Sequence, residues 1–409
     1  MKYLKILIVI AITVISCKEI KDDSVKTNSK SNPSTISVEG KQPFLFSNGN
    51  TLFMSFTKKI NDSVHVVKFS KLENGKWTEA IEIARGDDWF VNWADFPAIA
   101  ENNGNIASHF LEKSDPATFA YDVHLKISND NGQHWNDDFL LHTDSTKTEH
   151  GFVTILPYKE DAFFTTWLDG RNTGGGEHSD GHSSAGAMNI RTATISKTGE
   201  VIDDTLVDAK TCDCCQTSAA ITPKGPIIVY RDRTDGEVRD IYISRLLDGS
   251  WTIPKSINND NWVIDGCPVN GPKAAANNNT LAIAWFTAAN NIPKVNVVFS
   301  GDSGATFNKL IQIDNGKPMG RVDIALLDEN NALVSWMEST ENDAEIKVMK
   351  VDNYGKKQEP IVVTTLSAAR ASGFPQMELV DDNVYIAWNH IEDDKVSIKV
   401  KRMHVDDFK

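Results

Sequence analysis

Three short apolar runs end in tryptophan in the second half of the chain: residues 281–285 (LAIAW), 332–336 (ALVSW) and 384–388 (VYIAW). The tryptophans are 51 and 52 residues apart. Similar runs end earlier at Phe56, Phe110, Trp167 and Tyr230. Each run follows a short apolar strand and a turn, and precedes a strand of period two, a glycine-containing hairpin and a fourth strand. A four-stranded unit repeated seven times is typical of a β-propeller.

The ends of the repeat predict how the ring closes. Units begin near Pro43, Phe96, Phe152, Thr217, Pro272, Arg321 and Phe374. The last unit has three strands, and residues 35–38 (TISV) have the alternation to supply the fourth. We therefore predict an all-β fold, a single propeller of seven four-stranded blades over residues 35–409 that an N-terminal strand closes. Six blades are the alternative.

Length and charge exclude some classes of protein. The chain has 409 residues, of which 40% are hydrophobic, so it is long enough for a large core. Its formal net charge is −14, with 42 Lys and Arg against 56 Asp and Glu. Binding to nucleic acid needs a basic surface, so no nucleic-acid partner is expected. We expect a monomer.

The first residues read as an export signal. Residues 1–16 combine a basic start with an apolar run from Ile6 to Ile15, which is too short to span a bilayer. The small residue before Cys17 resembles the bacterial lipoprotein signal, which implies lipidation of Cys17. Residues 17–34 are polar and predict a flexible tether. We therefore expect a lipid-anchored protein of the bacterial cell envelope, on the outer membrane and facing the periplasm or the surface, with the lipid as its only membrane contact.

Two turns carry a motif with a known fold. Residues 128–135 (SNDNGQHW) match the Asp-box, Ser-x-Asp-x-Gly-x-x-Trp, and residues 300–307 (SGDSGATF) match it with Phe in the last place. Weaker relics stand at 74–77 and 248–251. The chain thus resembles the sialidase-type (BNR) propellers. The Asp-box is a folding device, so it predicts a fold rather than an activity. Seven units depart from the six blades of the catalytic sialidases.

Polar and aromatic residues gather in loops of one face, here called the top face, which leads into the innermost strands. These loops contain Trp93, Asp95, Glu149, Arg231, Asp265, Arg321, Arg370 and the insert 169–188. As residues that line a ligand site we predict Trp93, Asp169, Arg171, Arg233 and Asn270. Trp93 would alternatively pack its loop onto the next blade, and the charged residues would form links between blades.

The propeller cysteines lie at the same level of two neighbouring units. Cys212, Cys214 and Cys215 lead into unit four, and Cys267 leads into unit five. Two disulfides are the default in an exported protein, although a bond within Cys-x-Cys-Cys is awkward. A soft-metal site and redox chemistry are the alternatives. The three possibilities stay open at this point.

A metal site is the functional hypothesis that we pursue. Cys212, Cys214, Cys215 and Cys267 are its candidate ligands for copper or zinc, with His150, His178 and His182 as auxiliaries. Three cysteines within four residues cannot all face one way along a strand, so the segment must turn. The top face would bind the metal or another small ligand.

The resemblance to sialidases implies a second hypothesis, a glycoside hydrolase or a glycan-binding protein. Sialidase chemistry needs three arginines for a carboxylate, a tyrosine activated by a glutamate, and an aspartate as acid. Arg231, Arg321 and Arg370 are weak candidates for the clamp, and Asp95 for the acid. Tyr230 reads as a core residue, Tyr354 lies at a bottom hairpin, and nothing places Tyr121 at the axis. Whether the protein is an enzyme, sialidase-like or metal-dependent, therefore stays open.

Overall fold

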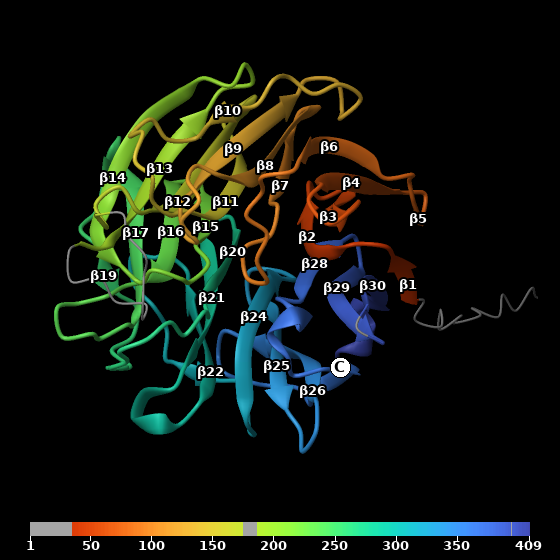
Figure 1. The fold of residues 1–409 in the computed structure, drawn as a ribbon. Coiled ribbons are helices and arrows are strands. Elements are labelled where there is room, and N and C mark those ends of the chain that lie inside the picture. Colours follow the sequence, from red (N-terminus) through yellow and green to blue (C-terminus); the bar gives the residue numbers. More distant parts are fainter. Residues whose placement is uncertain (1–34, 175–185, 394) are drawn as a thin grey trace, which may run out of the picture. The chain divides into compact units, whose positions relative to one another are not determined.

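A computed structural model describes residues 35–174, 186–393 and 395–409, which form seven antiparallel sheets arranged in a ring (Figure 1). The predicted all-β propeller with seven blades is confirmed. Cys17, His178 and His182 lie outside the described residues, so lipidation, the tether and the two insert histidines stay predictions. No helix in the described part of the chain has the length and apolar character to cross a membrane.

The first four blades follow one another along the chain, each running from the axis outward. In the first and fourth blades the outer edge is split between two short strands, because β6 pairs with β4 beside β5, and β19 pairs with β17 beside β18. Their strands are β2 (Lys41–Ser47), β3 (Leu52–Lys59), β4 (His65–Glu73), β5 (Lys76–Trp77) and β6 (Ile81–Gly86); β7 (Ile99–Asn102), β8 (Asn105–Lys113), β9 (Tyr121–Ser128) and β10 (Phe139–Leu140); β11 (His150–Tyr158), β12 (Ala162–Asp169), β13 (Met188–Ile195) and β14 (Val201–Thr211); and β15 (Ser218–Thr222), β16 (Gly225–Arg231), β17 (Ile241–Leu247), β18 (Ser250–Trp251) and β19 (Lys255–Ser256).

The last three blades complete the ring. Their strands are β20 (Lys273–Asn277), β21 (Thr280–Thr287), β22 (Lys294–Ser300) and β23 (Ile311–Gln312); β24 (Pro318–Leu326), β25 (Asn331–Ser339), β26 (Ala344–Asp352) and β27 (Ile361–Leu366); and β28 (Gln376–Val380), β29 (Asn383–Glu392) and β30 (Lys395–His404). Short 3₁₀ turns occupy Ala289–Asn291, Arg370–Ser372 and Val405–Asp407.

The N-terminal strand closes the ring as predicted. Strand β1 (Thr35–Val38) pairs antiparallel with β30, with Thr35 opposite Lys401 and Val38 opposite Ile398. The last blade therefore takes its fourth strand from the start of the propeller sequence. This pairing covers the edge that β30 would otherwise expose.

The repeated aromatic markers are the core between blades. Trp167, Trp285 and Trp336 are almost fully buried at the ends of the second strands of their blades. Each lies in an apolar cluster whose residues come from neighbouring sheets, as Val322, Val334 and Trp336 do beside Trp262 and Phe286. These aromatic residues therefore recur once per blade because each sheet buries a large side chain against the next sheet.

The Asp-box turns have the expected geometry. The Asp130 carboxylate accepts hydrogen bonds from the backbone N–H groups of Gln133 and His134, and Ser128 Oγ accepts one from Gly132 N. Asp302 accepts the equivalent bond from Thr306 N. Gly132 and Gly304 have φ values of 86° and 77°, which favour glycine. Both turns join the third and fourth strands, on the face opposite the candidate site.

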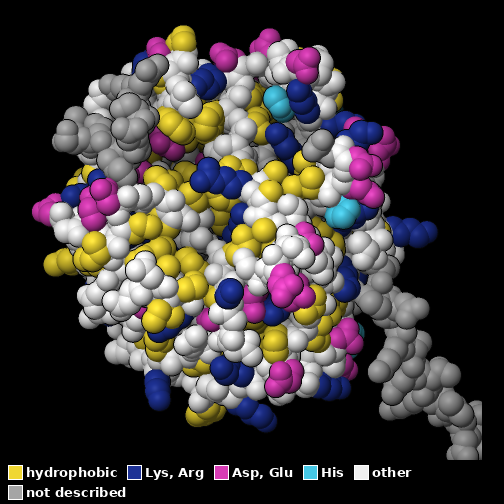
Figure 2. Space-filling model, turned by 60° about the horizontal axis from the view of Figure 1, so that its bottom comes forward, with side chains coloured by type: hydrophobic (Ala, Val, Ile, Leu, Met, Phe, Trp, Pro, Cys, Tyr) yellow, Lys and Arg dark blue, Asp and Glu magenta, His cyan; other side chains and the backbone are white. Residues whose placement is uncertain are grey.

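The surface drawn in Figure 2 mixes side-chain types. Small groups of exposed hydrophobic side chains stand between acidic and basic ones, without one large area of a single charge in this view. Such a surface gives no general attraction for one kind of charge, so a binding site has to be sought in local geometry.

Candidate functional site

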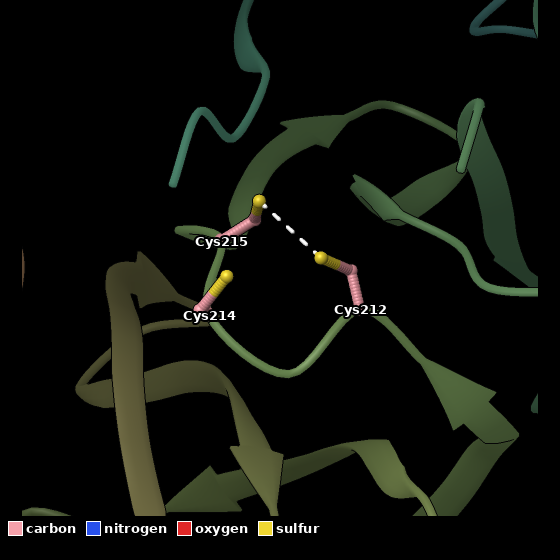
Figure 3. Close-up of side chains that lie close together, drawn as sticks. All are labelled: Cys212, Cys214 and Cys215. Carbon is pink, nitrogen blue, oxygen red and sulfur yellow. Dashed lines mark hydrogen bonds between the residues drawn. The ribbon is translucent and has the colours of Figure 1, made fainter. Parts of the chain in front are cut away.

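Three cysteines gather on the turn that joins β14 to β15. The Sγ atoms of Cys212, Cys214 and Cys215 all lie within 4.8 Å of one another. Cys212 Sγ is 3.5 Å from Cys215 Sγ, well beyond a disulfide bond, and all four propeller cysteines are free thiols. Figure 3 shows the three sulfur atoms pointing into one small space. The predicted turn of this segment is thus present.

Positive groups and backbone donors surround the sulfur atoms. Arg239 Nη1 donates to Cys212 Sγ at 3.3 Å, and the backbone N–H of Asn270 donates to Cys215 Sγ at 3.4 Å. Burial alone would raise the pKa of Cys212, but hydrogen bonds with Cys214 and Cys215 and the charge of Arg239 bring it well below its usual value. Burial raises the pKa of Cys215. The cluster therefore contains one sulfur that favours the thiolate form, which is the form that binds metals.

Cys267 lies at the edge of this cluster, on the exposed loop before β20. It lines the same cavity as Cys214, and a hydrogen bond from Cys214 lowers the pKa of Cys267. The two predicted cysteine segments therefore do meet, and Cys214 is the residue of the first segment that contacts Cys267.

A cavity of about 250 Å³ opens beside the thiols on the top face. Its walls are largely apolar and aromatic, with a few polar and charged side chains among them. It is lined by Phe90, Asn92, Trp93, Ala94, Phe119, Tyr121, Glu149, Phe152, Thr173, Gly186, Met188, Asp213, Cys214, Arg233, Cys267 and Val269.

The cavity contains a tyrosine–glutamate pair that sequence reasoning missed. The Tyr121 hydroxyl donates to Glu149 Oε1 at 2.6 Å. Burial raises the pKa of Glu149 to about 8, with a further contribution from Asp213, while the bond from Tyr121 acts in the opposite direction. Tyr121 opens β9 and Glu149 directly precedes β11, and a parallel bridge joins the two residues. The sequence gave no reason to place Tyr121 at the axis, and the structure places it in this cavity beside the axial channel.

Asp95 lies close to the same tyrosine–glutamate pair. Its Oδ2 accepts the backbone N–H of Phe152 at 2.7 Å, and a Cβ on Gly151 would stand 2.5 Å from that oxygen and 3.3 Å from the Tyr121 ring. Glycine at 151 is thus required for this close approach. Asp95 is buried and lines the axial channel rather than the cavity, which does not favour the predicted role as an acid.

Two of the three arginines that were candidates for binding a carboxylate instead make contacts that stabilise the fold. Arg231 is 1% exposed and donates to the carbonyl oxygens of Asn270, Arg239 and Phe286. Arg321 Nη1 donates to Gly373 O at 2.9 Å. Arg370 is exposed, and both Arg321 and Arg370 stand over the Trp93 ring. Among residues 35–174, 186–393 and 395–409, no three arginines line the cavity.

Of the five predicted ligand-lining residues, two line the cavity and three lie elsewhere. Trp93 and Arg233 line the cavity, and Trp93 also stacks on Phe374 with ring centroids 5.5 Å apart. Arg233 is held by Asp213 and Glu237. Asn270 links blades, because its Oδ1 accepts the backbone N–H of Arg321. Asp169 and Arg171 pair with each other away from the cavity.

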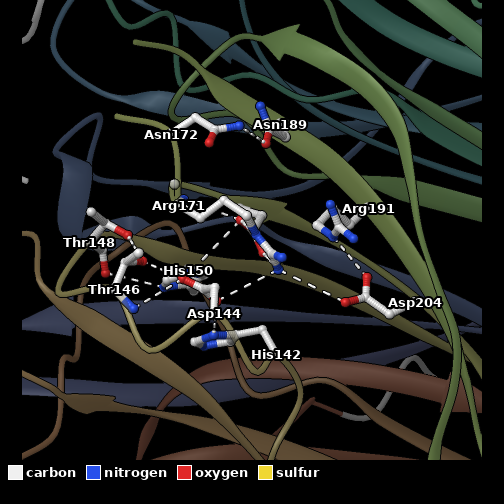
Figure 4. A network of polar contacts seen from close by, with 12 residues as sticks. His142, Asp144, Thr146, Thr148, His150, Arg171, Asn172, Asn189, Arg191 and Asp204 are labelled. Atoms are coloured by element: carbon white, nitrogen blue, oxygen red, sulfur yellow. Dashed lines mark hydrogen bonds and ion pairs between the residues drawn. The ribbon is translucent and has the colours of Figure 1, made fainter. Parts of the chain in front are cut away.

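A second cluster, here called the histidine cluster, consists of Asp122, His142, Asp144, His150 and Asp169. Figure 4 shows His142, Asp144 and His150 of this cluster close together. The rings of His142 and His150 are stacked, with centroids 3.6 Å apart and planes 6° apart. His142 Nδ1 lies 2.7 Å from Asp144 Oδ1. His150 was predicted as an auxiliary ligand of the thiols. Its ring nitrogens instead face carbonyl and carboxylate oxygens of this cluster.

Comparisons with known proteins identify the fold. No family model and no curated protein matches the chain. Among solved structures, polysaccharide lyase Uly1 is similar over 90% of each chain at 11% identity, with a TM-score of 0.51. NanB sialidase from Streptococcus pneumoniae matches 92% of this chain and 95% of its own at 10% identity and a TM-score of 0.47. Trypanosoma rangeli sialidase matches 91% of this chain and 59% of its own at 12% identity and a TM-score of 0.48. At this identity, the likeness to Uly1 indicates a shared fold and nothing further.

Proposed function

We propose that the top face of this propeller binds a soft transition metal, copper(I) or zinc(II), through Cys212, Cys214 and Cys215. The observation that carries the proposal is the convergence of three free sulfur atoms within 4.8 Å of one another. Thiolates select these two metals over harder cations. Metal–sulfur bonds of about 2.3 Å put neighbouring sulfur atoms roughly 3.8 Å apart in a tetrahedral site. The 3.5 Å between Cys212 and Cys215 is close to that value.

The surroundings support a metal that remains accessible. Arg239 offsets part of the negative charge that three thiolates bring into a buried place. Cys214 and Cys267 face the cavity, so one side of the metal would be open to a small ligand. Cys267 is the candidate for a fourth sulfur ligand. The glutamate–tyrosine pair across the cavity would then act on a molecule bound at the metal.

Metal content measured together with accessible thiols tests the proposal. Protein purified without chelators is expected to hold about one copper or zinc ion per chain by mass spectrometry. Cys212→Ser and Cys215→Ser should lose the ion. Asp213→Asn changes the same turn, spares every sulfur, and should retain it. Two disulfides, with no metal retained after reduction and reconstitution, would rule the proposal out.

A second candidate function is glycan binding or hydrolysis. The cavity favours it, because Trp93 and Phe119 offer ring surfaces to a sugar and Tyr121 with Glu149 forms the pair that the sialidase resemblance requires. Solved neighbours of this fold include a polysaccharide lyase and sialidases by name. Against a sialidase mechanism, Arg231 and Arg321 already donate to backbone carbonyl oxygens.

Glycan binding has its own readout. A broad glycan array and release of sialic acid, measured on folded protein, test the second candidate. Trp93→Ala and Tyr121→Phe should weaken any signal, whereas Tyr354→Ala, at an exposed residue of a bottom hairpin, should not. Clean negatives on the array would remove this candidate and leave the metal proposal untouched.

A further inference from the structure

The histidine cluster contains a buried nitrogen that lacks a hydrogen-bond partner. His150 is fully buried, and its Nδ1 lies 3.2 Å from Thr148 O and 3.3 Å from Tyr121 O. A proton on Nδ1 satisfies both carbonyls and leaves a lone pair on Nε2. Nε2 itself has no hydrogen-bond partner. Such a nitrogen, fixed through its other ring N–H, is the usual arrangement of a metal-binding histidine.

Two carboxylates face this lone pair. Nε2 of His150 lies 3.4 Å from Asp144 Oδ2 and 3.8 Å from Asp169 Oδ1, and the three atoms are within 4.8 Å of one another. Arg171 offsets part of the charge of these carboxylates, because its Nε lies 2.7 Å from Asp169 Oδ1 and its Nη2 lies 3.6 Å from Asp144 Oδ1. The lone pair of His150 Nε2 still repels the two oxygens that face it, and a cation between the three atoms would remove this repulsion. Asp144 lies in the loop before β11, His150 begins β11 and Asp169 ends β12. The fold of the third blade therefore sets the positions of all three residues.

The distances at His150 Nε2 fit a shared metal ion better than a short charged hydrogen bond. A charged N–H···O bond closes to about 2.7–2.9 Å. His142 Nδ1 and Asp144 Oδ1 do so in the same cluster, at 2.7 Å. The gaps at His150 Nε2 are longer. Bonds of about 2.0–2.2 Å to one shared ion place two ligand atoms roughly 3.4 Å apart at a tetrahedral angle and about 3.8 Å apart at a wider one.

We propose that a divalent transition-metal ion, of the zinc or manganese type, binds between Asp144, His150 and Asp169. One imidazole and two carboxylates suit such borderline ions, whereas the thiol cluster suits softer ones. Arg171 holds Asp169 in a bidentate contact, which orients the carboxylate toward the site. This second site is independent of the thiol proposal.

The ion would be a structural support for the cavity. His150 directly follows Glu149, and its Nδ1 contacts the carbonyl of Tyr121. A metal that fixes the His150 ring therefore fixes the backbone on both sides of the tyrosine–glutamate pair. Loss of the ion should loosen the cavity even though no ligand atom lines it.

Zinc binding to a variant without propeller thiols tests the site. In a folded Cys212→Ser, Cys214→Ser, Cys215→Ser, Cys267→Ser protein, about one Zn²⁺ per chain should remain. Asp144→Asn or Asp169→Asn in that background should weaken Zn²⁺ binding by at least about 100-fold. Asp138→Asn, which removes the carboxylate of the exposed His124 pair, is the matched control and should bind normally. Absence of stoichiometric zinc, or equal binding by all three aspartate variants, would overturn the proposal.

If the thiol-free variant does not fold, X-ray absorption spectroscopy on the unmodified protein tests the second site. Zinc-loaded protein should show two populations of zinc, one with sulfur neighbours and one with nitrogen and oxygen neighbours only. A shell of sulfur alone would overturn the second site and support the first. A shell of nitrogen and oxygen alone would do the reverse.

Discussion

Arg231 offers the sharpest test of how the top face is built. Its guanidinium is buried at the end of β16 and donates to three carbonyl oxygens: Asn270 O at 2.8 Å, Phe286 O at 2.7 Å and Arg239 O at 2.6 Å. These carbonyls belong to the fourth and fifth blades. The guanidinium also stands 4.8 Å from the centre of the Trp262 ring. We predict that Arg231→Met lowers stability and that its effect on ligands is secondary.

The expected cost follows from these contacts. Hydrogen bonds to a charged group contribute about 1.5–3 kcal/mol each, and a buried carbonyl left without a donor costs about 1–3 kcal/mol. The contributions do not add fully, and Met relieves the burial of a charge. We therefore expect a loss of about 3–5 kcal/mol in the free energy of unfolding. Arg231→Lys keeps the charge without the planar fork and should lose less.

Urea unfolding followed by tryptophan fluorescence measures the loss, and Trp262 reports on the site itself. Arg370→Met removes an exposed arginine from the same face and should change stability by less than about 0.5 kcal/mol. If Arg231→Met matched the unmodified protein in stability and lost only ligand binding, Arg231 would be a ligand clamp and the structural account would be wrong.

Three further predictions concern other parts of the ring. Burial raises the pKa of Glu378 in the axial channel to about 8, so this group favours the folded state at low pH and opposes it as the pH rises through 8. The free energy of unfolding should therefore fall by at least about 1 kcal/mol between pH 5 and pH 8.5. Urea titrations of Glu378→Gln should show a smaller dependence on pH. Asp302→Ala removes the acceptor of Thr306 N in an Asp-box and should cost about 1 kcal/mol, whereas Asp343→Ala, at an exposed hairpin, should cost less. Val38→Asp puts a charge on the strand that closes the ring and should lower the thermal midpoint, and an unchanged midpoint would mean that β1 contributes little to closure.

The repeat could be predicted from the sequence because every blade meets the same physical requirement. Every blade must bury a large side chain against its neighbour, so Trp285 and Trp336 recur at the spacing of one sheet. The closing strand could be predicted from its alternation and from the missing strand of the last blade. The thiol cluster was predictable as well, because two cysteine segments precede the innermost strands of adjacent blades.

The tyrosine–glutamate pair could not be predicted in the same way. Tyr121 and Glu149 are 28 residues apart and belong to different blades. Their meeting depends on the path of the loop before β11, which forms a parallel bridge to the start of β9. A repeat locates strands within blades, but it does not give the approach of one blade's loop to the next blade.

Bulges at the top of the innermost strands set side-chain directions that the repeat does not give. The pairing register shifts between Gly151 and Thr154 in β11, and Phe152 has a φ of 53°. Arg321 in β24 lies at a similar shift with a φ of 52°, and Gln42 in β2 has a φ of 58°. A two-residue alternation continued through such a point gives the wrong face. His150 therefore points into the histidine cluster and not toward the thiols, and Arg321 is directed to backbone carbonyls. The residues that the bulges redirect belong to the face that carries the candidate sites, which is where bulges are expected to reposition side chains for function.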